Sequence, residues 1–89
     1  MSTAYTSKLA YSSVQELSSK QFEVFLKIVE LQPCSNKSIA EALNWEINRV
    51  TGRVNELAKR GLIKSEKTAR NSIGRLEKLW ETKEEYARD

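Results

Sequence analysis

The segment from Ile47 to Gly61 combines an apolar stripe with side chains that can hydrogen-bond to nucleic-acid bases. Five apolar residues recur at helical spacing: Ile47, Val50, Val54, Leu57 and Ala58. A helix that directs this stripe inward exposes its opposite side, which carries Asn48, Gly52, Asn55, Glu56 and Lys59, flanked by Arg49, Arg53 and Arg60. Arginine can form two hydrogen bonds with guanine and asparagine two with adenine, and each good pair discriminates by about 1–3 kcal/mol. Residues near the start of such a helix reach base edges most easily, so the predicted base-reading residues are Asn48, Arg49, Gly52 and Arg53.

Basic residues gather in the same half of the chain. From residue 47 to residue 78 there are nine basic and three acidic residues, whereas residues 1–44 hold four of each. Such an excess favours an anionic partner, because cations that neutralise phosphates release counterions. The predicted phosphate contacts are Ser35, Asn36, Lys37, Thr51, Lys64, Lys67, Arg70 and Arg75. A solvated charged hairpin is the alternative for the last four, and ordinary helix capping is at least part of the role of Ser35 or Asn36.

Three helices are expected to position these residues. The spacing of Phe22, Phe25, Leu26 and Val29 predicts an amphipathic helix over 18–31, with a capping box formed by Ser18 and Gln21 and an end before Pro33. A short helix over 36–43 should bury Ile39, Ala40 and Leu43 and stop at a left-handed Asn44. The third helix is the one that starts at Ile47, and Gly61 should end it.

The segment after Gly61 predicts a β-hairpin. Residues 62–68 and 75–81 are the candidate strands and residues 69–74 the turn. Leu76, Lys78 and Trp80 share one face, so that face is expected to pack on the helices. A helical interpretation of Leu76, Leu79 and Trp80 stays open. The expected fold class is α+β, with three main helices followed by a β-hairpin, a loose arm at 1–17, a domain at 18–82 and a charged tail at 83–89.

The order of these elements resembles the winged helix-turn-helix superfamily over about residues 18–80. The second helix carries S-N-K-S-I-A-E-A-L, and the most specific stretch is V-x-x-x-V-x-E-L-x-x-x-G-L-I from Val50 to Ile63. The chain is similar in this respect to prokaryotic regulators of the MarR type and to small phage-encoded winged-helix proteins. The resemblance implies a transcriptional regulator that reads double-stranded DNA, with the third helix in the major groove and the hairpin wing on the backbone.

Other classes of protein fit the sequence less well. With no histidine and one cysteine, zinc clusters of Cys and His and imidazole triads are impossible within one chain, so we expect no enzyme, no metal and no cofactor. The lack of a long apolar run and of a signal-peptide pattern predicts a cytoplasmic protein that does not contact a membrane. A protein–protein interaction module, such as an adaptor in a replication or assembly complex, is the main alternative, because fold does not fix function.

Four features leave two interpretations each. Gly52 costs about 1 kcal/mol in a helix, which either permits close approach to DNA or is a neutral exposed substitution. Trp45 is either a wedge against DNA or, as we favour, a cap on the core, and Cys34 is either a redox sensor or, as we favour, a silent thiol. Regulators of this kind commonly bind as two-fold dimers, so a homodimer is also considered. The side chains that could form its surface, or instead pack back on the domain, are Tyr5, Leu9, Tyr11, Val14 and Leu17.

Overall fold

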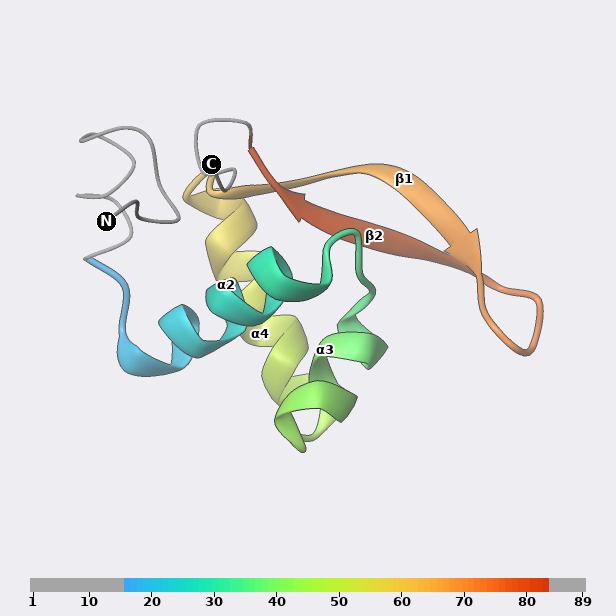
Figure 1. Ribbon diagram of the computed structural model, residues 1–89, viewed down its shortest axis with the longest axis horizontal. Helices are drawn as coiled ribbons and strands as arrows, with labels where there is room; N and C mark the ends of the chain where they lie inside the picture. The colour runs from blue at the N-terminus through green and yellow to red at the C-terminus, as the bar shows by residue number, and fades with distance from the viewer. Residues whose placement is uncertain (1–15, 84–89) are drawn as a thin grey trace.

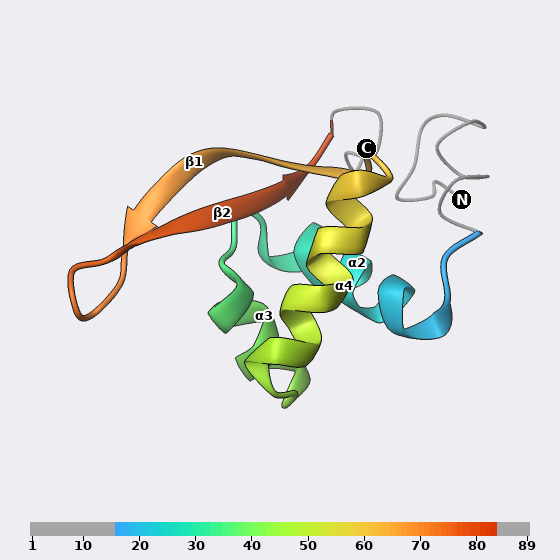
Figure 2. The ribbon, with the colours of Figure 1, turned by 180° about the vertical axis from the view of Figure 1, so that it is seen from behind.

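The computed structural model describes residues 16–83, which form three helices and a two-stranded antiparallel hairpin. The elements are α2 (Ser19–Leu31), α3 (Asn36–Leu43), α4 (Ile47–Lys59), β1 (Ile63–Arg70) and β2 (Leu76–Thr82). The helices pack together, and the hairpin extends past them on one side of the molecule (Figures 1 and 2). This confirms the predicted α+β class, with three main helices followed by a hairpin wing.

The helix ends lie where the local sequence signals predicted them. The Ser18 side chain accepts a hydrogen bond from the Gln21 amide at 3.2 Å, and the Gln21 side chain accepts one from the Ser18 amide at 3.0 Å. Ser35 caps α3 by accepting a hydrogen bond from the Ser38 amide, and it is this residue rather than Asn36 that does so. Asn44 and Gly61 both have positive φ values, of 58° and 78°, which ends α3 and the turn after α4 as expected.

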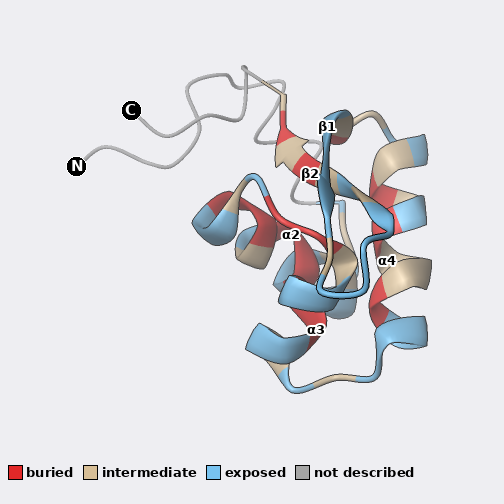
Figure 3. Cartoon of the chain, turned by 90° about the vertical axis from the view of Figure 1, so that its right-hand side faces the viewer, coloured by how far each residue is buried: buried red, intermediate tan, exposed pale blue. Residues whose placement is uncertain are grey.

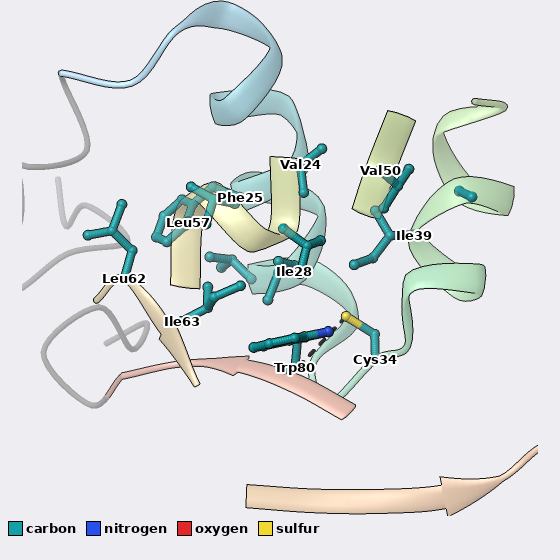
Figure 4. Close-up of a cluster of buried hydrophobic side chains, with 13 residues drawn as sticks. Val24, Phe25, Ile28, Cys34, Ile39, Val50, Leu57, Leu62, Ile63 and Trp80 are labelled. Carbon is teal, nitrogen blue, oxygen red and sulfur yellow. Dashed lines mark hydrogen bonds between the residues drawn. The ribbon is translucent and has the colours of Figure 1, made fainter. Parts of the chain in front are cut away.

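The core lies between the three helices and the near end of the hairpin. Its largest fully buried side chains come from every helix and from the start of the hairpin (Figure 4): Phe25, Ile28, Ile39, Leu57, Leu62, Val24, Val50 and Val54. The three valine and leucine members of the predicted α4 stripe are among them. Ile47 is not, because it begins α4 and 45% of it remains exposed. The inward stripe of α4 is therefore one residue shorter than predicted.

The buried face of α2 differs from the predicted one. Val24, Phe25, Ile28 and Val29 are buried, whereas Phe22 and Leu26 are exposed. Apolar residues occupy more than one side of this helix, so the helical period alone leaves the buried side open. The packing of α3, α4 and β2 against α2 selects the side that carries Ile28. Figure 3 shows buried segments along α2, between the other elements.

The hairpin joins the helical layer only at its base. β1 and β2 pair from Ile63 opposite Thr82 to Arg70 opposite Leu76, with an irregularity between Lys64 and Lys67. At the base, Trp80 exchanges two backbone hydrogen bonds with Cys34, and the Gln32 side chain accepts hydrogen bonds from the amide and hydroxyl of Thr82. The prediction that Leu76 packs on the helices is wrong: 64% of it is exposed, because the hairpin has left the helices by that point.

Some predictions fall on parts of the chain that the structure does not describe. The arm at 1–17 and the tail at 83–89 lie mostly outside the described residues, as do Tyr5, Leu9, Tyr11 and Val14 of the suggested dimer surface. Leu17 is described, and it packs against the core. Within residues 16–83 no helix has the length and apolar content needed to cross a membrane, and no cluster of three metal-ligating side chains occurs.

Candidate nucleic-acid interface

The outward side of α4 is the centre of the candidate interface. The side chains of Asn48, Asn55 and Lys59 are exposed and form no hydrogen bond or ion pair within residues 16–83. Gly52 lies between them on the same side, and a Cβ atom added there would meet nothing within 4 Å. Residues 16–83 therefore give no packing reason for the glycine, and both interpretations of Gly52 stay open.

Arg49 is oriented by an aromatic ring. Its guanidinium carbon lies 5.2 Å from the centroid of Trp45, and the amine of Lys20 lies 5.2 Å from the same centroid. A cation at this distance is attracted by the negative face of the ring. Trp45 is half-buried and packs against the core, which confirms its role as a core cap and adds a second role in supporting Arg49.

Arg53 is engaged within the protein. Its Nε donates to Oε1 of Glu56 at 2.9 Å and its Nη2 donates to Oε2 at 2.8 Å. The Nε2 of Gln21, on α2, donates to the same Oε1 at 2.8 Å. The hydrogen bonds from Arg53 and then from Gln21 lower the pKa of Glu56, because they stabilise its charged form. The spacing of Arg53 and Glu56 is visible in the sequence, but the third partner, 35 positions away, is not.

The start of α3 meets the side of α4 that faces the hairpin. The Nδ2 of Asn36 donates to the Thr51 hydroxyl at 3.3 Å, and that hydroxyl donates to the carbonyl of Ile47 at 2.9 Å. These two predicted phosphate contacts thus link α3 to α4, while neighbouring Lys37 is exposed. An open pocket of about 340 Å³ lies beside them, lined by Ser35, Asn36, Lys37, Ile47, Asn55, Glu77, Lys78 and Trp80.

The cations of the hairpin differ in their surroundings. Lys64 pairs with Glu66 at 3.4 Å and Lys67 with Glu81 at 4.0 Å, so both have a carboxylate partner in β1 or β2. At the tip, the Nη1 of Arg70 donates to the carbonyl of Gly74 at 2.8 Å, whereas the side chain of Arg75 is exposed. The structure brings the predicted contacts to three places: the outward side of α4, the start of α3 and the hairpin.

Sequence reasoning missed how two residues hold a third on this surface. Glu56 accepts hydrogen bonds from Arg53 and from Gln21, and so ties Arg53 of α4 to α2. The i,i+3 spacing to Arg53 was the available signal for Glu56. Asn71, which the sequence places in the predicted turn, organises the hairpin tip through its side chain.

Comparisons with known proteins identify a family and several structures of similar fold. The model of the MarR family matches residues 17–72. Two variants of Lactococcus lactis ZitR have 28% and 30% sequence identity to the chain, with TM-scores of 0.63 and 0.60, and each match covers 80% of this chain and 46% of that one. NMB1585, a MarR family regulator from Neisseria meningitidis, is 21% identical with a TM-score of 0.61, over 85% of this chain and 51% of its own.

The chain therefore spans about half the length of the solved structures that it matches. A comparison with curated proteins gave no match. The family match extends from the residue before the capping box of α2 to the turn of the hairpin, and so includes all of α4. This chain belongs to the MarR family, and its fold is the winged helix-turn-helix.

Proposed function

We propose that the protein is a transcriptional regulator that binds double-stranded DNA in a sequence-specific manner, with α4 in the major groove and the hairpin on the adjacent backbone. The observation that carries this proposal is the outward side of α4, where Asn48, Asn55 and Lys59 have no partner within the described residues. The major groove is wide enough to admit a helix, and it presents donors and acceptors that distinguish all four base pairs.

In this proposal Asn48, Arg49, Gly52 and Arg53 meet base edges. Asn48 and Arg49 belong to the first turn of α4 and are exposed, and Trp45 supports the guanidinium of Arg49 from behind. Gly52, in the next turn of the same helix, has no side chain, so the helix backbone can come close to the major groove there. The MarR family membership supports the same mode of action.

The proposed phosphate contacts form two groups. They are Ser35, Asn36, Lys37 and Thr51 near the start of α3, and Lys64, Lys67, Arg70 and Arg75 on the hairpin. The start of α3 adds free backbone amides and the positive end of a helix dipole to this set. Phosphate contacts of this kind position the protein but do not read sequence.

A protein-binding role is favoured at a different surface. Phe22 and Leu26 are exposed one turn apart on α2, which is where an apolar partner such as a second copy of the chain would pack. The outward side of α4 carries no comparable anchor, apart from Ile47 at its start. We therefore assign a protein partner, or a homodimer, to α2 as the second candidate function, and DNA to α4.

Fluorescence anisotropy with duplex DNA tests the proposal. A random-sequence duplex and a genomic pool are titrated at about 50 and 200 mM salt, over which several phosphate contacts should weaken binding by orders of magnitude. One duplex enriched from the pool, the selected duplex, should bind more tightly than the random one. No binding at the lower salt concentration would rule out the proposed function.

Arg49→Ala should weaken binding to the selected duplex more than to the random duplex, by about 1–3 kcal/mol, because it removes a base contact. Lys27→Ala is the matched control, since it removes one positive charge from an i,i+3 pair on α2. Equal losses on both duplexes would show that Arg49 contacts only the backbone.

A further inference from the structure

We propose that Glu56 determines sequence selectivity by holding Arg53 away from phosphates, so that Arg53 joins the DNA only at a matching base pair. This inference rests on the proposed function and deepens it. It concerns a residue on α4 whose charge is opposite to that expected for a surface that binds DNA.

The carboxylate of Glu56 occupies one of the edges through which Arg53 could bind DNA. Its two oxygens accept from Nε and Nη2 of Arg53 at 2.9 and 2.8 Å, which is the two-point geometry in which arginine also binds phosphate or guanine. Arg53 cannot make both sets of hydrogen bonds through Nε and Nη2 at once. Any DNA contact through this edge must therefore replace the ion pair.

A second helix fixes the carboxylate in place. Gln21 donates to Oε1 of Glu56 at 2.8 Å, and the Oε1 of Gln21 accepts from the amide of Ser18 at 3.0 Å. Gln21 belongs to the capping box at the start of α2, so the helix end holds it. The carboxylate is thereby anchored on a neighbouring helix while remaining 42% exposed.

The other i,i+3 ion pairs of the described chain lack this arrangement. Lys20 and Glu23 are 3.7 Å apart, and Lys27 and Glu30 are 3.3 Å apart, each with no donor from a second helix. These are ordinary helix-surface pairs. The Arg53–Glu56 pair on α4 differs from them in its shorter distances and in its third partner, Gln21.

The consequence for selectivity follows from what DNA offers. In a random duplex, Arg53 mainly meets phosphate. Binding a phosphate exchanges one anionic partner of Arg53, the Glu56 carboxylate, for another. It also leaves the Glu56 carboxylate without Arg53, close to the negatively charged backbone. A guanine at the matching position adds hydrogen bonds to O6 and N7, which a random sequence does not supply at that position. Glu56 thus weakens binding to a random duplex more than it weakens binding to a duplex with the matching guanine. Weakening the competing complex is one of the two ways to achieve specificity.

Glu56→Gln is the direct test, because it removes the charge and keeps the shape. We expect the affinity for the random duplex to rise by roughly three- to tenfold and the salt dependence to steepen by about one unit, as expected for one additional phosphate contact. The affinity for the selected duplex should change less, so the ratio of the two affinities should fall. Glu30→Gln, which removes the same charge from the pair on α2, should leave that ratio unchanged.

A double-mutant cycle separates the effect on Arg53 from a general effect of charge. In an Arg53→Ala background, Glu56→Gln should no longer change the ratio, because the residue through which it acts is absent. Gln21→Ala should shift the ratio in the same direction as Glu56→Gln but by less, since it loosens the carboxylate without changing the net charge. It also provides a second variant should Glu56→Gln unfold, which thermal denaturation would reveal.

The outcomes distinguish this inference from the proposed function. An unchanged ratio in Glu56→Gln, or the same change with and without Arg53, would overturn the role of Glu56 while leaving DNA binding intact. Absence of duplex binding by the wild-type protein at about 50 mM salt would overturn both.

Discussion

The two ends of the β-hairpin are stabilised in different ways. At the base, Ile63, Trp80 and Thr82 are buried, and Trp80 is joined to Cys34 by backbone hydrogen bonds. The Cys34 side chain lies beside the Trp80 ring (Figure 4). At the tip, 74% of Ile73 and 64% of Leu76 are exposed. Apolar burial therefore attaches the hairpin to the domain, but it contributes nothing to the shape of the tip.

Local polar contacts define the tip instead. The Oδ1 of Asn71 accepts hydrogen bonds from the amides of Ile73 and Arg75, both at 3.0 Å, and its Nδ2 donates to Glu77 at 2.9 Å. Gly74 has a φ of 82°, which the turn requires and which other residues rarely adopt. The base of this hairpin therefore supplies stability, while the tip can present cations without a cost to the core.

The largest effect is expected at the base. Trp80→Ala should lower the free energy of unfolding by about 3–5 kcal/mol, because it leaves a cavity between the hairpin and the helices. Leu76→Ala, a comparable loss of apolar side chain at the tip, should change it by less than about 0.5 kcal/mol. Urea denaturation of both variants measures the difference, and similar values would contradict the division of the hairpin into two ends.

The thiol of Cys34 should report the burial of the base. Desolvation raises its pKa to about 11, from the usual 9.0, so the folded protein keeps the thiol neutral at a pH where an unfolded chain begins to ionise. A maleimide or a disulfide reagent at about pH 8 should therefore react slowly with the folded protein and rapidly with the urea-unfolded chain. This expectation agrees with the silent thiol that we favoured from the sequence.

The same shift gives a pH dependence with a definite sign. Because the folded-state pKa lies above the unfolded one, the unfolded chain loses its proton first, and stability falls as the pH rises from about 9 toward 11. The free energy of unfolding lost through this thiol should reach about 2 kcal/mol near pH 11. Subtracting the pH profile of Cys34→Ala isolates it from other titrating groups, and parallel profiles would show that the thiol is not desolvated.

The smallest effect is expected at the tip. Asn71→Ala should remove the hydrogen bonds that shape the turn and accelerate amide hydrogen exchange at Ile73 and Arg75, with a loss of about 1 kcal/mol or less in global stability. The amide of Trp80 should exchange as slowly as in the wild type. Faster exchange at Trp80 as well would mean that the two ends of the hairpin unfold together.

Much of the fold could be predicted because its signals are local. The capping box at Ser18, the left-handed Asn44 and the positive φ of Gly61 each depend on a few neighbouring residues, and they lie where predicted. For the cap of α3 the sequence leaves Ser35 and Asn36 open, and the structure selects Ser35. The apolar period of α4 likewise predicts the buried side of that helix, and the exposure of Asn48 and Lys59 on the other side agrees with it. For the candidate site, the sequence thus predicts the helix and its exposed side, and the contacts of its residues with DNA stay predictions.

The tertiary structure alone decided how those residues are connected. The buried side of α2, the exposure of Leu76 and the hold of Gln21 on Glu56 all depend on elements that are distant in the chain. A helical period shows which residues share a side, but only the packing of other elements determines which side is covered. The sequence therefore determined the elements and their chemistry, and the tertiary structure determined which side chains are already occupied by one another, because such contacts require a geometry that no short stretch of sequence contains.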